Sequence, residues 1–180
     1  MKLLIVTLNV LGWPLIQLSL ARLFLLLPDA RFAKDSWLTR ERLLEQNGRL
    51  YRFLAIQRWK ELLPDGASWL GGRPKKSLAS RCMADLTTSA IETRRAETAH
   101  WCMLMCTPVF FLWNPGWACV VMTLYGFAAN VPCIVVQRAN RIKMERILHH
   151  LTNVAGLASE AEARPSIGSS VRLTGLAIND

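Results

Sequence analysis

Apolar residues occur in two long blocks that are separated by a polar middle. The first block covers residues 3–27 and is strongly interrupted at only three positions, Asn9, Gln17 and Arg22. Because a helix needs about 20 apolar residues to cross the hydrocarbon core, this block predicts an N-terminal transmembrane helix. A cleaved signal peptide is the alternative, but the following Pro28-Asp29 fits a small-residue cleavage site poorly, and we expect a retained anchor.

The polar middle, residues 28–99, is rich in arginine and lysine. Apolar residues recur in it at helical spacing between Leu43 and Leu63, with arginines between them, which predicts an amphipathic helix. Such a helix can lie at a membrane interface or pack on the protein's own core, and the pattern favours neither. A glycine-rich basic turn follows at residues 71–76. Its Lys75 could hold a phosphate or a carboxylate, although a plain surface loop is the simpler interpretation.

The second apolar block covers residues 101–137 and is broken by Asn114-Pro115-Gly116. Its first piece, residues 101–113, reaches only about 20 Å as a helix, so it either continues the preceding helix or enters the membrane as a re-entrant half. The second piece, residues 117–136, is long enough to span. Together they predict a C-terminal hydrophobic hairpin. The basic flanks place the polar middle and the C-terminal flank in the cytoplasm, although Lys2 argues against that orientation.

Composition agrees with a small all-α integral membrane protein. The chain has 180 residues, of which 52% are hydrophobic, and its net charge is +9. In a soluble protein this charge would suggest nucleic acid, but beside apolar blocks it suggests the anionic face of a membrane. We expect no nucleic-acid partner, a multi-pass location in a bacterial cell membrane, one domain over residues 1–150, and a mobile tail over residues 151–180. Five cysteines without CxxC spacing do not predict a disulfide framework.

The strongest chemical signal lies where the second apolar block begins. In a helix, His100 is flanked by Glu92 and Glu97, and Arg95 lies one turn from Glu92. A histidine oriented by a carboxylate is a common general base. A solvated helix with Glu–Arg pairs is the alternative, but ionisable residues beside a membrane segment are costly unless they are paired or functional.

A second polar cluster closes the last apolar helix. Asn130 lies inside this helix, and four further polar residues end it: Gln137, Arg138, Asn140 and Arg141. Anchoring at the membrane surface explains the two arginines but does not explain the amides, which usually bind a neighbouring helix or a ligand. His149 and His150 point to different helix faces, so we expect no metal site, and no cofactor is implied.

These two clusters resemble motifs of the glycosyl-4,4'-diaponeurosporenoate acyltransferase family. The motifs are Ile91-Glu92-Thr93-x-Arg95-Ala96-Glu97-x-x-His100-Trp101 and Ala129-Asn130-Val131-Pro132-x-Ile134-Val135-Val136-Gln137-Arg138-x-Asn140-Arg141. The resemblance covers roughly residues 15–148. It implies an enzyme of the cell membrane that transfers a fatty acyl group to the primary hydroxyl of a glucose joined to a C30 carotenoid acid, in the last step toward staphyloxanthin. The implied partners are a membrane glycolipid acceptor and a fatty-acyl thioester donor.

Roles within this reaction follow from chemistry and position. We expect His100 to act as the base, Glu97 or Glu92 to orient it, and Asn130 or Gln137 to donate to the oxyanion. The expected substrate-binding residues are Arg95, Arg138, Asn140, Arg141 and Lys75. No serine lies in a nucleophile elbow, so we expect direct transfer. The alternative is a non-catalytic membrane scaffold that binds lipid or carotenoid, in which the same polar pairs hold helices together.

Overall fold

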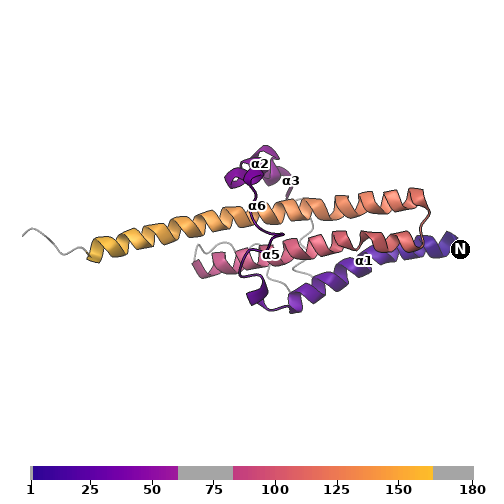
Figure 1. The fold of residues 1–180 in the computed structure, drawn as a ribbon, viewed down its shortest axis with the longest axis horizontal. Helices are drawn as coiled ribbons and strands as arrows, with labels where there is room; N and C mark the ends of the chain where they lie inside the picture. Colours follow the sequence, from indigo (N-terminus) through magenta and orange to yellow (C-terminus); the bar gives the residue numbers. More distant parts are fainter. Residues whose placement is uncertain (1, 61–82, 164–180) are drawn as a thin grey trace, which may run out of the picture.

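The computed structural model describes residues 2–60 and 83–163, and every regular element in these two segments is a helix. Three long helices run alongside one another: α1 (Lys2–Leu26), α5 (Met83–Met105) and α6 (Gly116–Ala163) (Figure 1). Helices α5 and α6 form an antiparallel hairpin, and α1 packs on α5. The predicted all-α fold with an N-terminal apolar helix and a C-terminal hairpin is therefore confirmed.

Helices α1 and α6 are both long and apolar enough to cross a membrane. Trp13 is the one buried residue of α1, and many leucines and valines on the rest of this helix are exposed. So much exposed apolar surface is unfavourable in water but suits contact with lipid acyl chains.

The structure of the hairpin shows which conformation residues 101–113 adopt. Helix α5 runs through Trp101 to Met105, and η5 (Thr107–Leu112), a 3-10 helix, follows it. Pro108 lacks the N–H that would continue the α-helical ladder, which explains the change of helix type. Of the two possibilities that the sequence left open, the piece therefore continues the preceding helix.

Close packing holds α1 against the tip of the hairpin. The Trp13 ring stacks on Phe110 with ring centroids 4.9 Å apart. A Cβ added to Gly12 would lie 3.0 Å from Phe110, and one added to Gly126 would lie 2.8 Å from both Trp13 and Thr107. These two glycines therefore provide the room in which α1, η5 and α6 meet.

A polar contact lies beside this packing. The Asn9 amide nitrogen donates to the Asn114 amide oxygen at 2.8 Å, and the Asn9 oxygen accepts a bond from the Trp113 indole at 2.9 Å. Interhelical hydrogen bonds of this kind satisfy polar groups in an apolar environment. They explain why one of the interruptions of the first apolar block is an asparagine.

The chain between α1 and α5 forms several short helices. They are η1 (Asp29–Arg31), η2 (Leu43–Gly48), α2 (Arg49–Phe53) and α3 (Ile56–Trp59). The sequence predicts one amphipathic helix from Leu43, but the structure divides it at Gly48 and Ala55, which have φ values of 75° and 48°. A left-handed residue cannot continue a right-handed helix.

We call residues 37–59 the shelf. Its Tyr51 and Ile56 pack against Val136 and Ile142 of α6 in a small hydrophobic core. Figure 1 shows α2 and α3 on the side of α6 that faces away from α1 and α5. The shelf is thus attached to the hairpin just beyond the apolar part of α6.

The predicted boundary at residue 150 falls inside α6, which continues to Ala163 and has exposed side chains from Thr152 to Glu160. The remaining tail, residues 164–180, lies outside the described residues. So does the glycine-rich turn with Lys75.

Candidate functional site

His100 projects from α5 toward Asn130 of α6. The distance from His100 Nδ1 to Asn130 Oδ1 is 3.1 Å. The Asn130 side chain is fully buried, and its Nδ2 donates to the Gly126 carbonyl at 2.9 Å. This second bond fixes the amide, so its oxygen faces the imidazole. Because an amide oxygen only accepts, this arrangement calls for the proton on His100 Nδ1, which leaves on Nε2 the lone pair that a general base needs.

The two carboxylates that were expected beside His100 contact arginines instead. The Glu97 carboxylate contacts the Arg141 guanidinium, and its Oε1 lies 3.0 Å from Arg138 Nε. Glu92 accepts a bond from Arg95 at 2.6 Å. A buried carboxylate is far better compensated by a full positive charge than by a neutral imidazole. The predicted residues thus form two groups, His100 with Asn130 and Glu97 with the two arginines of α6.

The guanidinium groups of Arg138 and Arg141 are directed at protein oxygens. Besides Glu97, Arg138 lies 3.4 Å from the Glu45 carboxylate, and Arg141 lies 3.7 Å from that of Glu145. Both also donate to backbone oxygens at the start of the shelf, namely those of Thr39, Leu38 and Arg40. These arginines hold the shelf and the hairpin together.

Arg95 ties the end of α1 to α5. Its guanidinium contacts the carboxylates of Glu92 and Asp29 and lies 5.3 Å from the centre of the Phe32 ring. It also donates to the Leu27 carbonyl at 3.3 Å. Of the remaining predicted residues, Gln137 is buried on α6 and Asn140 is half-buried.

Glu45 and Tyr51 belong to the charge cluster formed by Glu97, Arg138 and Arg141, and the sequence analysis did not predict either residue there. The Tyr51 hydroxyl donates to the buried Glu45 carboxylate. Burial and this hydrogen bond raise the pKa of Tyr51 above its ordinary value. The available signal was that Glu45 is the one acidic residue, and Tyr51 the one residue with a hydroxyl group, between Leu43 and Trp59.

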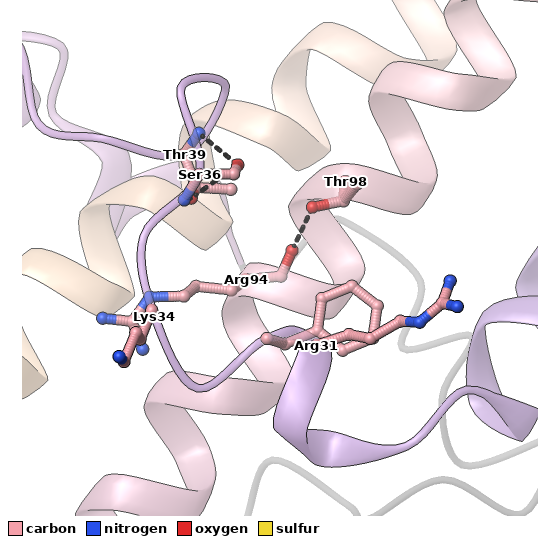
Figure 2. A pocket seen from close by; sticks show the side chains of 7 residues that line it. Arg31, Lys34, Ser36, Thr39, Arg94 and Thr98 are labelled. Atoms are coloured by element: carbon pink, nitrogen blue, oxygen red, sulfur yellow. Dashed lines mark hydrogen bonds between the residues drawn. The ribbon is translucent and has the colours of Figure 1, made fainter.

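A small hollow of about 90 Å³ lies between η1, the start of the shelf and α5. It is lined by Arg31, Phe32, Lys34, Ser36, Thr39, Arg94 and Thr98. Figure 2 shows the Arg31 guanidinium pointing away from the Ser36–Thr39 pair. Thr98 and His100 are two residues apart, so they lie on nearly opposite faces of α5. The hollow is therefore not adjacent to the imidazole.

Within residues 2–60 and 83–163, no group of three or more histidine, cysteine, aspartate or glutamate side chains is arranged to hold a metal ion.

Comparison with known proteins gives a consistent result. The model of the glycosyl-4,4'-diaponeurosporenoate acyltransferase family matches residues 34–150. A protein of that name from Staphylococcus haemolyticus is 31% identical over 135 residues, which are 74% of this chain and 78% of the relative. One from Staphylococcus aureus is 27% identical over 141 residues, which are 77% of this chain and 85% of the relative. No solved structure matches the chain.

Proposed function

Since the chain belongs to the glycosyl-4,4'-diaponeurosporenoate acyltransferase family and is thus an acyltransferase, we propose that it esterifies a sugar hydroxyl of a membrane glycolipid with a fatty acyl group. The names of its relatives support a glycosylated carotenoid acid as the acceptor. The two apolar helices support the cell membrane as the location, since both such an acceptor and a fatty acyl chain partition into lipid.

One observation carries the catalytic part of this proposal, the pair of His100 and Asn130. His100 Nε2 removes the proton of the sugar hydroxyl while that oxygen attacks the carbonyl carbon of an acyl thioester. A C–O bond forms, the C–S bond breaks, and the leaving thiolate takes the proton back from the imidazolium. The reaction then needs no acyl-enzyme and no other oxidant, reductant or cofactor.

Asn130 orients the imidazole in this mechanism, as asparagine does in some nucleophile–histidine–asparagine sites. Its oxygen accepts the Nδ1 proton, so the base lone pair stays on Nε2. The expected orienting role of Glu97 is replaced here by a structural one, because Arg138 and Arg141 neutralise that carboxylate. Gln137, buried on the same helix as Asn130, is then the amide left for the oxyanion.

The alternative function is a non-catalytic scaffold that binds lipid or carotenoid. Under that alternative the His100–Asn130 bond is an interhelical contact and has no chemical role. The two functions make opposite predictions about a variant that inserts normally but lacks the imidazole.

The test is mass spectrometry of glycolipids from a host that supplies a glycosylated carotenoid acid and carries the intact gene or a variant. We expect an ester-linked acyl product with the intact protein, and a loss of about 10²–10⁴-fold in the rate for His100→Ala. The matched control is His150→Ala, which removes an exposed histidine of α6. Full product formation by well-inserted His100→Ala would exclude the proposed base. No product from the intact protein would favour the scaffold.

A further inference from the structure

The shelf carries large apolar side chains that nothing in the described chain covers. Leu43 is 94% exposed, Phe53 86%, Leu44 82% and Trp37 79%. They are not the residues that attach the shelf to α6, because Tyr51 and Ile56 do that. An apolar group of this size on a small domain usually marks a binding surface.

Arginines lie close to these apolar residues along the chain. Five arginines are exposed on the shelf: Arg40, Arg42, Arg49, Arg52 and Arg58. Arg42 lies over the Trp37 ring, 5.2 Å from its centre. The shelf also contains two carboxylates: Glu45 is buried against Tyr51 and Arg138, whereas Glu41 is exposed, so the exposed charge of the shelf remains strongly positive. The surface is therefore both apolar and cationic, which matches an anionic lipid layer.

The position of the shelf agrees with that partner. It packs on α6 at Val136 and Ile142, and the apolar run of α6 ends between these residues, at Gln137 and Arg138. At the same level Asp29, which follows the apolar run of α1, contacts Arg95 of α5. Figure 1 shows α2 and α3 projecting sideways from α6. An element that projects sideways where both apolar runs end is positioned to lie along a membrane surface.

We propose that the shelf docks on the anionic surface of the membrane and inserts Trp37, Leu43, Leu44 and Phe53 among the lipid acyl chains. The arginines then bind head-group phosphates, and their aliphatic stems cover apolar surface. The same docking fixes the rotation of α6 about its axis, since the shelf is bonded to this helix through Arg138 and Arg141. This inference concerns the shelf alone and does not depend on the proposed reaction.

Spin labels on the full-length chain test the insertion. Single cysteines, each with a nitroxide, replace Leu43 or Phe53 in a background without native cysteines, and the protein is placed in nanodiscs of phosphatidylcholine with or without phosphatidylglycerol. Leu15 on the exposed face of α1 and Lys143 on α6 provide reference positions in lipid and in water. We expect labels at positions 43 and 53 to be reached by oxygen in preference to a nickel chelate, as at position 15.

Two other outcomes would overturn the proposal. Access for the nickel chelate equal to that at position 143 means that the shelf faces water. Protection from both reagents, in both lipids, means that a protein surface, such as a second copy of this chain, covers the shelf.

A second variant tests the role of charge. Replacing Arg49 and Arg52 with glutamine leaves the contacts of the shelf to α6 in place, because Tyr51, Ile56 and the backbone oxygens make those contacts. We expect the ratio of oxygen access to chelate access at position 53 to fall about twofold or more in nanodiscs with phosphatidylglycerol and to stay the same without it. An unchanged ratio in both lipids would contradict recognition of anionic head groups.

Discussion

The carboxylate of Glu97 on α5 contacts the guanidinium of Arg141 on α6, and the exposed fractions of the two side chains are 0% and 1%. Arg138 shares the same carboxylate, and both arginines reach on to the shelf. One buried charge cluster therefore joins α5, α6 and the shelf. It lies beside the His100–Asn130 pair, since Glu97 and His100 are less than one helical turn apart.

We expect Glu97→Ala to lower the stability of the protein strongly. The substitution leaves Arg141 buried without its carboxylate, which typically costs about 3–5 kcal/mol. The measurement is the thermal unfolding midpoint in detergent, followed by tryptophan fluorescence. Asp35→Ala is the matched control. It removes a half-exposed partner of Arg94, but Arg94 keeps its contact with Glu145, so we expect a loss of stability of at most about 1 kcal/mol. Similar midpoints for the two variants would contradict a structural role for Glu97.

The glycines of the hairpin predict a second stability difference. In Gly126→Ala the new Cβ would lie 2.8 Å from Trp13 and Thr107, so α1 must move away from the hairpin. Overpacking of this kind costs about 1–3 kcal/mol. Gly156→Ala is the matched control in the same helix, because nothing lies within 4 Å of its Cβ. Equal unfolding midpoints would show that the contact of Trp13 with α6 is not tight.

Tyr51 predicts a dependence of stability on alkaline pH. Its pKa is raised by burial and by Glu45, so the folded protein keeps the phenol proton at pH values where the unfolded chain, with a pKa of about 10, loses it. The contribution to stability is thus complete below about pH 10 and is lost as the pH rises above that value.

A titration of tyrosinate absorbance measures this directly. The chain has two tyrosines, so Tyr125→Phe isolates the signal of Tyr51. We expect Glu45→Gln to lower the pH at which Tyr51 ionises, because it removes the negative charge while the burial remains. An ordinary titration in the unsubstituted chain would mean that water reaches the hydroxyl.

The apolar pattern predicted most of the fold, because a membrane helix is specified largely by length and composition. The block at residues 3–27 is α1, and the break at Asn114 is the turn of the hairpin. The sequence did not predict that the amphipathic helix is divided into shorter helices, because the spacing of apolar residues does not reveal a left-handed backbone conformation at Ala55.

The structure pairs the candidate residues differently from the prediction. Helical spacing placed Glu97 near His100, and this is correct for distance along α5. Spacing within one helix says nothing about which residues a second helix presents, and α6 brings Asn130 to His100 and the arginines to Glu97. Glu45 and Tyr51 were missed because their role depends on the shelf folding back onto α6, a contact between distant segments.

The Asn130–His100 bond predicts a tautomer that can be observed. Nitrogen NMR of protein with labelled imidazoles distinguishes Nδ1–H from Nε2–H, and the chain has three histidines, so variants of His149 and His150 assign the signals. We expect His100 to be protonated at Nδ1, because the Asn130 oxygen faces that atom.

Asn130→Leu should change both this signature and the reaction. Leucine fills the buried site but accepts no hydrogen bond, so the Nδ1–H form of His100 is no longer stabilised. We expect the acyl-transfer rate to fall about 10²-fold, and the affinity for the acceptor to change little. Asn130→Asp keeps an acceptor for Nδ1–H and should retain the tautomer and more of the rate than leucine does. A merely structural asparagine predicts a different order, in which aspartate, charged in a buried site, is the more damaging substitution. Leucine outperforming aspartate in the rate, with both variants well inserted, would therefore rule out Asn130 as the residue that orients the base.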